Sequence, residues 1–417
     1  MVKLKIIPEL IRLLKIIGRE CAKLKINAYL VGGPVRDLFL GKANIDLDIV
    51  LDKDVKTVLP SLAKLLSAKY IYHPQFKTAK LFLDSLYIDI ATAREEIYPC
   101  LGSLPRVFPT TDIKKDLFRR DFSINAMAIK ICEGGLGELL DPYNGWEDLR
   151  KGKIRVLHEK SFLDDPTRII RAIRFCVRLD FTLEKNTRLW LKKAVSRRVF
   201  SQISSARLGN EIFKLLQEKN LLAGIKKLRD LCGLKIIHPQ IIFNRRWERY
   251  FPEVSKWSRD FVQKTSQKVE EWLIYFIFLT EKLDKDALQE LCDKYELGKN
   301  NRLLVMHTYE LKRIEEAKLH NSKYSQLFNL LKPIFPETII FLIARLENKS
   351  LQKKLFEFLV RCSQIRLYTN GERLKKLGFS PGPIFNKILA TLFLAKLDGK
   401  ISTQSEEENF IKETFLR

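Results

Sequence analysis

Several features are scarce or missing in this sequence of 417 residues. No apolar run approaches the roughly 18 residues that a membrane-spanning helix requires, and the N-terminal stretch lacks the uninterrupted apolar segment of a signal peptide. The seven cysteines include no CxxC pair, and the five histidines form no HxxxH pattern. These absences argue against a membrane protein, a disulfide framework and a zinc site, and they favour a reducing cytoplasm.

Basic residues, by contrast, are in large excess. Lys and Arg number 75 against 50 Asp and Glu, which gives a net charge of +25. The segment 149–200 alone holds 15 basic and 5 acidic residues, although any single lysine there is explained equally well as a solvated surface group. An excess of this size indicates a polyanionic partner, and nucleic acid is the first candidate.

The hydrophobic pattern separates a mixed N-terminal region from a helical remainder. The expected elements are helices over 1–25 and 56–69 and strands over 28–31, 45–50, 79–83 and 87–93. They predict a small α/β unit that ends near 141–145. From about Asp165 onward the pattern is helical, with few strand candidates. A length of 417 residues suits about two to four domains.

A glycine pair follows the first expected strand. Gly32 and Gly33 precede Pro34, which opens an expected helix that ends at Gly41. Glycines let a backbone approach a ligand closely, and free amides at a helix start favour phosphate. Arg36, on the first turn, could reach the same phosphates. The motif alone fits a plain turn better than a phosphate site.

Two acidic residues, Asp46 and Asp48, alternate with apolar residues in the next strand. Residues i and i+2 of a strand point to one face, and neighbouring carboxylates repel unless cations bridge them. Two Mg²⁺ ions about 3.5–4 Å apart would bridge them, and such pairs catalyse in-line nucleotidyl transfer. Asp89, on a neighbouring strand, would complete the cluster. A solvent-facing acidic pair at a strand end explains the strand equally well.

These segments resemble one known family. GGPVRD followed by DLD is similar to the signature of the class II tRNA nucleotidyltransferases, the CCA-adding and A-adding enzymes, and of the related bacterial poly(A) polymerases. The blocks that continue the match in the family's order are ATAREE at 91–96, RRDFSINAMAI at 119–129, GWEDLRKGKIRVLH at 145–158 and DDPTRIIRAIRF at 164–175. The C-terminal half matches loosely, through 204–216 and 374–389.

The resemblance implies an α+β fold. It consists of a polymerase-β-like nucleotidyltransferase head with a mixed sheet, followed by an all-helical neck, body and tail. The implied domains are a catalytic head at 1–148, a neck with the nucleotide-selecting helix at 149–220, a body at 221–325 and an RNA-binding tail at 326–417.

The resemblance also implies roles for individual residues. Asp46 and Asp48 would bind two catalytic Mg²⁺ ions, and Asp89 would assist the attacking 3′-hydroxyl of the RNA. The residues implied in nucleotide binding are Gly32, Gly33, Arg36, Arg120, Asp121, Asp165, Arg168, Arg171 and Arg174. Asn125 is expected to support the ribose or the head fold.

Asp165 and Arg168 carry the most specific implication. Adenine and cytosine share an exocyclic amino donor beside an unprotonated ring nitrogen, so an aspartate can accept from the first while an arginine donates to the second. Guanine and uracil present the opposite pattern, which would exclude GTP and UTP at about 1–3 kcal/mol per mismatched group. Asp165 before Pro166 also suits a plain helix N-cap, and the two roles are compatible.

Three arginines recur every three residues along the same helix. Arg168, Arg171 and Arg174 are each rotated by roughly 60° from the last, so the first and the last cannot both touch one base. We assign Arg168 to the base, and Arg171 and Arg174 to phosphates or to positioning the helix. An ion-pair ladder to neighbouring acids is the competing interpretation.

The implied function is nucleotide addition to the tRNA 3′ end, from ATP and also CTP, without a nucleic-acid template. Residues 94–116 resemble the family's flexible loop at full length, which implies that the terminal A can be added. The partner would be the acceptor and T-arm of tRNA, gripped mainly through phosphates, and no protein partner is predicted. Addition of A alone, poly(A) synthesis and an inactive RNA-binding relative remain the alternatives.

Overall fold

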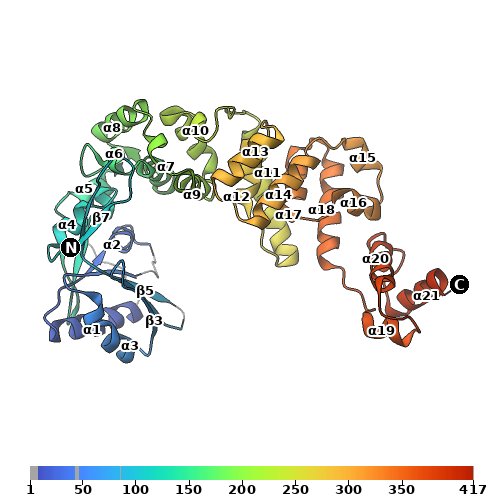
Figure 1. Ribbon diagram of the computed structural model, residues 1–417, viewed down its shortest axis with the longest axis horizontal. Helices are drawn as coiled ribbons and strands as arrows, with labels where there is room; N and C mark the ends of the chain where they lie inside the picture. Colours follow the sequence, from blue (N-terminus) through green and yellow to red (C-terminus); the bar gives the residue numbers. More distant parts are fainter. Residues whose placement is uncertain (1–7, 43–46, 85, 417) are drawn as a thin grey trace. The chain divides into compact units, whose positions relative to one another are not determined.

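The computed structural model describes residues 8–42, 47–84 and 86–416. The chain divides into two compact units, Met1–Glu211 with Glu218–Gly233 and Ile212–Gln217 with Leu234–Arg417. In Figure 1 the first unit runs from blue to green, and most of the second runs from yellow to red. The finer division into head, neck, body and tail stays a prediction.

Seven strands in the described part of the first unit form one mixed sheet, in the order β3-β4-β5-β2-β1-β8-β9. The strands are β1 (Ala28–Val31), β2 (Leu47–Leu51), β3 (Lys69–His73), β4 (Thr78–Phe82), β5 (Tyr87–Thr92), β8 (Ala128–Cys132) and β9 (Gly135–Leu140). β2 and β5 pair in parallel, and the other neighbours pair antiparallel. The mixed-sheet head predicted for the N-terminal region is confirmed.

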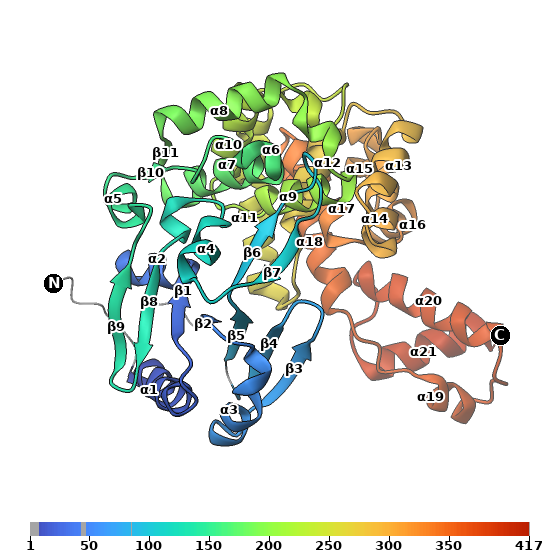
Figure 2. The ribbon, with the colours of Figure 1, turned by 60° about the vertical axis from the view of Figure 1, so that its left-hand side comes forward.

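The two faces of this sheet are covered by different helices. Leu30 belongs to the core that contains residues of α1 (Pro8–Lys23), whereas its neighbour Val31 packs in a second core with Leu117 of α4 (Ile113–Phe118). Successive side chains of a strand point to opposite faces, which explains the division. Figure 2 shows α1 beside β8 and β9. Val50 lies in the α4 core, so Asp48, two residues earlier, faces the same side.

One helix of the first unit is shorter than the sequence predicts. The helix expected over 56–69 is a 3₁₀ turn at Val55–Thr57 followed by α3 at Leu59–Leu65. It stops before Ser67, which has a positive φ of 50° and therefore cannot continue a right-handed helix. The remaining helices are α2 (Gly33–Phe39), α5 (Gly145–Arg150), α6 (Ser161–Asp164), α7 (Thr167–Leu179), α8 (Lys185–Ser196), α9 (Ser205–Leu216) and α10 (Leu221–Cys232).

Two further strand pairs lie outside the main sheet. β6 (Arg94–Ile97) and β7 (Arg106–Pro109) form an antiparallel hairpin, and β10 (Lys153–Ile154) pairs in parallel with β11 (Thr182–Leu183). The β6–β7 hairpin falls within the segment that resembles the family's flexible loop. The sequence pattern did not predict these strands.

The second unit is helical throughout its described residues, as predicted. Its helices are α11 (Trp247–Thr265), α12 (Glu271–Thr280), α13 (Lys285–Lys294), α14 (Lys299–Leu311), α15 (Glu316–Asn321), α16 (Tyr324–Leu331), α17 (Pro336–Arg345), α18 (Lys349–Gln364), α19 (Gly371–Lys376), α20 (Pro383–Leu397) and α21 (Gln404–Phe415). No single helix of the described chain has the length and apolarity to cross a membrane, although the sharply bent pair α16 and α17 would pass that test together.

Candidate active site

Two of the three predicted carboxylates lie side by side on the sheet. Asp48 of β2 and Asp89 of β5 are direct partners in the parallel register. Both line a cavity of about 580 Å³ together with Arg119 and Arg120. Asp46, the remaining member of the predicted cluster, lies outside the described residues. The β2–β5 register places the two acids on one cavity wall, and the end of α4 brings the two arginines to the same cavity.

Lys80 is a functional candidate that the sequence analysis missed. It lies opposite Asp89 on β4, and its Nζ atom is 3.4 Å from Oδ1 of Asp89 and 3.9 Å from the ring centroid of Tyr87. Its ammonium group offsets part of the negative charge at the carboxylate pair. The alternation in AKLFL could have predicted which face of the strand carries Lys80. Only the β4–β5 register identifies Asp89 as its partner.

The carboxylate pair suits a hard divalent cation. Mg²⁺ binds oxygen ligands, usually one or two carboxylates together with substrate phosphates. Asp48 and Asp89 supply carboxylates of this kind on one cavity wall. Among the described residues, no group of three or more His, Cys, Asp or Glu is close enough to enclose a metal by itself. The donors fit an ion that shares its ligands with a bound nucleotide.

Arg120 lies against the glycine turn with part of its guanidinium unpaired. Its Nη2 atom donates to Asp116, at 2.9 Å, whereas its buried Nε atom has no hydrogen-bond partner in the described structure. Gly32 has a φ of 73°, and a Cβ atom added there would lie 2.8 Å from Nη1 of Arg120. The turn thus needs glycine for two reasons, its backbone conformation and the close approach of this arginine.

The two glycines of the turn are expected to differ sharply on substitution. Gly32→Ala should lower the free energy of unfolding by about 1–3 kcal/mol because it strains the backbone and displaces Arg120. A Cβ atom at Gly33 would meet only Nη2 of Arg36, at 3.7 Å, so Gly33→Ala should leave stability nearly unchanged. Chemical denaturation of both variants checks this, and equal losses would contradict it.

Arg36 and Asp121 belong to one buried network beneath the turn. Asn125 joins them, accepting from Nη1 of Arg36 at 2.7 Å and donating to Oδ1 of Asp121 at 3.0 Å. Arg171 donates to Oδ2 of Asp121 from Nε and Nη2, at 3.0 and 2.6 Å. Burial opposes ionisation of Asp121, but Arg171 and Asn125 outweigh it and hold the pKa of this carboxyl below its ordinary value. The network fixes the positions of Arg36 and Arg171 and supports the fold.

This network predicts loss of stability in acid. A carboxyl whose pKa is depressed on folding stabilises the protein above its unfolded pKa, about 3.9, and the stabilisation is lost as the pH falls through the folded value. Melting temperatures measured from pH 7 downward should therefore drop below about pH 4. The drop should be shallower in Asp121→Asn, which should already melt lower at pH 7. Parallel pH profiles would contradict the assignment.

Arg174 occupies an ion-pair ladder. It donates to Glu211 at 2.6 Å and to Glu218 at 3.1 Å, and Arg178 also binds Glu218, at 2.6 Å. Arg174 thus takes part in the ion-pair ladder that was the competing interpretation of the arginine repeat. These pairs connect α7 to the α9–α10 region. A direct nucleotide contact by Arg174 stays a prediction that this pairing does not favour.

Asp165 and Arg168 have separate partners. Oδ1 of Asp165 accepts from the backbone N–H of Thr167 at 3.0 Å and from Arg207 at 2.9 Å, so the predicted capping bond is present. Arg168 is buried and donates to Ser161 at 2.7 Å and to the carbonyl oxygen of Arg119 at 2.8 Å. Within the described structure the two side chains form no bond with each other, which leaves each able to address a different atom of a base.

A second cavity, of about 600 Å³, lies beside Arg168. Phe118 and Tyr98 are among its lining residues. Burial is the main cause that raises the pKa of Tyr98 to about 12, so its hydroxyl stays protonated at neutral pH. That hydroxyl donates to Glu96 at 3.1 Å and accepts from Arg168 at 3.4 Å. Tyr98 therefore links the β6–β7 hairpin to α7.

Asp116 is a further residue that the sequence analysis missed. Its carboxylate is fully buried and accepts from both Arg119 and Arg120, at 2.9 Å each. Burial opposes its ionisation, but the two arginines outweigh it and hold its pKa below the ordinary value. The spacing of three and four residues in DLFRR is typical of helical ion pairs and could have identified it.

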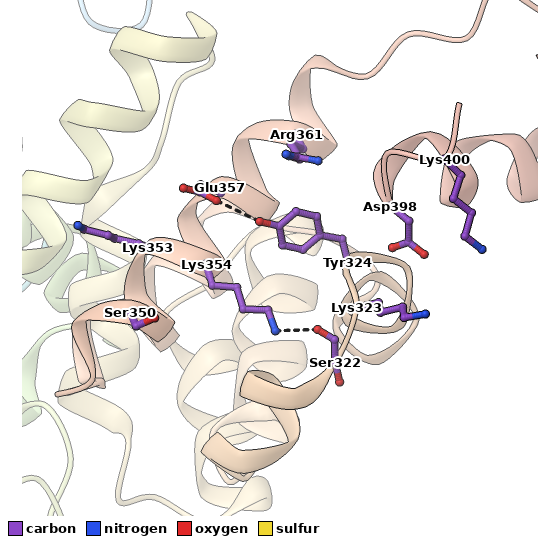
Figure 3. Close-up of a pocket in the computed structure, with 10 residues that line it drawn as sticks. All are labelled: Ser322, Lys323, Tyr324, Ser350, Lys353, Lys354, Glu357, Arg361, Asp398 and Lys400. Carbon is purple, nitrogen blue, oxygen red and sulfur yellow. Dashed lines mark hydrogen bonds between the residues drawn. The ribbon is translucent and has the colours of Figure 1, made fainter. Parts of the chain in front are cut away.

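A separate basic pocket lies in the second unit. It has a volume of about 670 Å³, and Figure 3 shows it between α18, the start of α16 and the end of α20. The cations that line it are Lys323, Lys353, Lys354, Arg361 and Lys400. None of the five forms a salt bridge in the described chain. Its two acids, Glu357 and Asp398, accept from the neutral hydroxyls of Tyr324 and Ser325 and keep their charge, so five cations face two carboxylates. The pocket therefore carries uncompensated positive charge.

Comparison with known proteins identifies the family. Residues 28–155 match the poly A polymerase head domain, and residues 180–243 match the probable RNA- and SrmB-binding site of polymerase A. An A-adding tRNA nucleotidyltransferase of Halalkalibacterium halodurans is 30% identical over 97% of this chain and 92% of its own length. The chain belongs to the tRNA nucleotidyltransferase family. The resemblance drawn from the sequence blocks is confirmed.

Other members of the family match along most of the chain. The A-adding tRNA nucleotidyltransferase of Geobacter sulfurreducens is 31% identical over 95% of the chain, which spans only 46% of that relative's length. The Thermotoga maritima CCA-adding enzyme in complex with tRNA is 32% identical, with a TM-score of 0.72 over 98% of this chain and 96% of its own. A CCA-adding enzyme with ATP is 33% identical, with a TM-score of 0.76 over 98% and 95%.

Proposed function

We propose that this protein transfers nucleotides from ATP, and from CTP, to the 3′ end of tRNA to build or complete CCA without a nucleic-acid template. The observation that carries the proposal is the placement of Asp48 and Asp89 in register on one cavity wall with Arg120. Membership of the tRNA nucleotidyltransferase family supports the same reaction. The predicted cytoplasmic location suits this substrate.

The residues that line the cavity have different roles in the proposed reaction. The 3′-hydroxyl oxygen of the RNA forms a bond to the α-phosphorus of the nucleotide, the bond to the bridging oxygen breaks, and pyrophosphate leaves. Asp89 accepts the proton of the hydroxyl or orients that group. Arg120 lies beside the glycine turn with its Nε donor unpaired among the described residues, and it binds the triphosphate, whose charge it offsets.

The same carboxylates would hold Mg²⁺. The sequence implies Asp46 and Asp48 as the ligands; Asp48 lies in the described structure, and Asp89 beside it would complete the cluster. When bound, the metal supplies Lewis-acid activation of the hydroxyl and neutralises charge on the phosphates. Lys80 binds Asp89, keeping this carboxylate partly neutralised in the protein alone.

The second unit would hold the RNA. Its basic pocket carries five cations without carboxylate partners and two acids that are already hydrogen-bonded. Phosphate groups of a nucleic-acid backbone are the matching ligands, because they bind cations in any sequence context. The acceptor and T-arm of tRNA are the partner that we propose.

Removing two of these cations should weaken RNA binding without affecting chemistry. In Lys353→Gln combined with Lys400→Gln, the KM for tRNA at low salt should rise about tenfold, and the slope of log affinity against log salt should flatten by about one to two. The kcat at saturating tRNA should stay at the wild-type value. Lys387→Gln, an exposed lysine of α20 outside the pocket, is the matched control. An unchanged salt slope in the double variant would contradict the assignment.

Product length decides which nucleotides are added. Labelled ATP or CTP is supplied separately to tRNA transcripts that end before CCA, after C and after CC. Extension of every transcript indicates CCA addition. Extension of the CC transcript with ATP, without extension of any transcript with CTP, indicates A addition alone, which the two A-adding relatives favour as the second candidate. Long A tails would indicate poly(A) synthesis, and no product from any transcript would overturn the proposal.

A further inference from the structure

Arg207, near the start of α9, connects two segments that meet at the nucleotide-selecting helix. Its Nη2 atom donates to Oδ1 of Asp165 at 2.9 Å, and its Nη1 atom donates to the carbonyl oxygen of Gly102 at 2.8 Å. Gly102 lies between β6 and β7, in the segment 98–105. One guanidinium thus binds both a residue assigned to base selection and the loop of the hairpin.

The bonds at Asp165 are distributed unevenly between its two oxygens. Oδ1 accepts three donors: the backbone N–H of Thr167 at 3.0 Å, the hydroxyl of Thr167 at 2.6 Å, and Arg207. Oδ2 accepts no hydrogen bond from any described residue. Three donors on one oxygen fix the rotation of the carboxylate and leave the other oxygen free to accept.

The loop end of the bridge is also fixed. The N–H group of Gly102 donates to the carbonyl oxygen of Leu163 at 3.1 Å. Gly102 has a φ of 69°, and a Cβ atom added there would lie 2.6 Å from the carbonyl oxygen of Gln202. Only glycine permits this docking, which turns the Gly102 carbonyl toward Arg207.

We propose that Arg207 is a positioning residue for nucleotide selection. It holds the Asp165 carboxylate so that Oδ2 is presented to the exocyclic amino group of adenine or cytosine, and it couples this orientation to docking of the β6–β7 loop at Gly102. The inference rests on the proposed function, because it assigns a task within the choice of nucleotide. Without Arg207, the cap bonds of Thr167 remain, but the carboxylate loses the one charged hydrogen-bond partner that it has among the described residues.

Selectivity measurements on the full chain test this inference. Arg207→Gln should reduce the preference for ATP and CTP over GTP and UTP about tenfold, the effect expected when one charged hydrogen bond to the selecting carboxylate is lost. The KM for ATP should rise more than kcat falls. Arg207→Lys keeps the charge and should recover part of the preference. Gly102→Ala should shift the preference in the same direction with Arg207 intact, because the loop can no longer dock.

A matched control variant and the wild-type protein distinguish failure of this inference from failure of the proposed function. Arg188→Gln removes one exposed cation from α8 of the same unit and should retain the wild-type preference. An Arg207→Gln variant that is less heat-stable but keeps wild-type selectivity would reduce Arg207 to a structural contact and overturn the inference. If Arg207→Gln fails to fold, unaltered selectivity in a folded Gly102→Ala variant has the same consequence. A wild-type protein that adds no nucleotide to tRNA would instead overturn the proposed function.

Discussion

Replacing Asp48 by asparagine should lower the rate of nucleotide addition by about 10³-fold or more. The substitution keeps the size of the side chain but removes a charge that lies in register with Asp89 on the cavity wall. A divalent cation at this position supplies several kcal/mol of transition-state stabilisation, and about 4 kcal/mol corresponds to 10³-fold. Single-turnover extension of tRNA with saturating ATP measures the loss.

Binding of tRNA should survive this substitution. The proposed phosphate contacts lie in the second unit, whereas Asp48 belongs to the first, so the dissociation constant for tRNA should stay within about twofold of the wild-type value. Asp84→Asn is the matched control, since Asp84 is exposed between β4 and β5. Turnover near the wild-type rate in Asp48→Asn would refute the metal assignment, and with it the chemistry proposed for the cavity.

The sequence predicted those parts of the site that depend on local periodicity. Alternation along β2 and β5 was enough to predict which face of its own strand each of Asp48 and Asp89 occupies, because the side chains of a strand repeat every two residues. The β2–β5 register of the seven-stranded sheet then makes the two aspartates direct neighbours on the same face. The glycine turn was likewise predictable, since a strand that ends in Gly32-Gly33 before a helix has few other conformations.

Contacts between distant segments could not be predicted. Lys80 meets Asp89 only because β4 pairs with β5, and Arg207 lies 42 residues from Asp165 and 105 from Gly102. No periodic pattern encodes such partners. The sequence pattern also missed β3, β8 and β9 of the main sheet.

Helix α7 shows how local and distant constraints combine. A rotation of about 60° between successive members of the arginine repeat requires separate partners. The structure supplies them, with Arg168 on the Arg119 carbonyl, Arg171 on Asp121 and Arg174 on Glu211. The sequence could predict that the three fan out. Which of them remains near a cavity depends on where the acids of other segments lie.

Arg168→Ala should relax the choice of nucleotide. Arg168 is the member of the repeat that lines a cavity and has no carboxylate hydrogen-bond partner among the described residues, so its remaining donors can address the ring nitrogen of adenine or cytosine. Losing one of the two matched groups should reduce discrimination against GTP and UTP by about 10- to 100-fold. The ratio of kcat/KM for each of the four nucleotides on one tRNA transcript measures this.

Arg178→Ala provides the control on the same helix. Arg178 also loses an ion pair on substitution, with Glu218, but it lies nearly at the end of α7 with 45% of its side chain exposed. It should therefore change stability slightly and selectivity not at all. If Arg168→Ala keeps wild-type discrimination while adding ATP at a reduced rate, Arg168 only holds Ser161 and the Arg119 carbonyl in place. Recognition of the ring nitrogen would then have to reside elsewhere, because that mismatch requires a donor at this position, whereas the mismatch at the exocyclic group requires the acceptor Asp165.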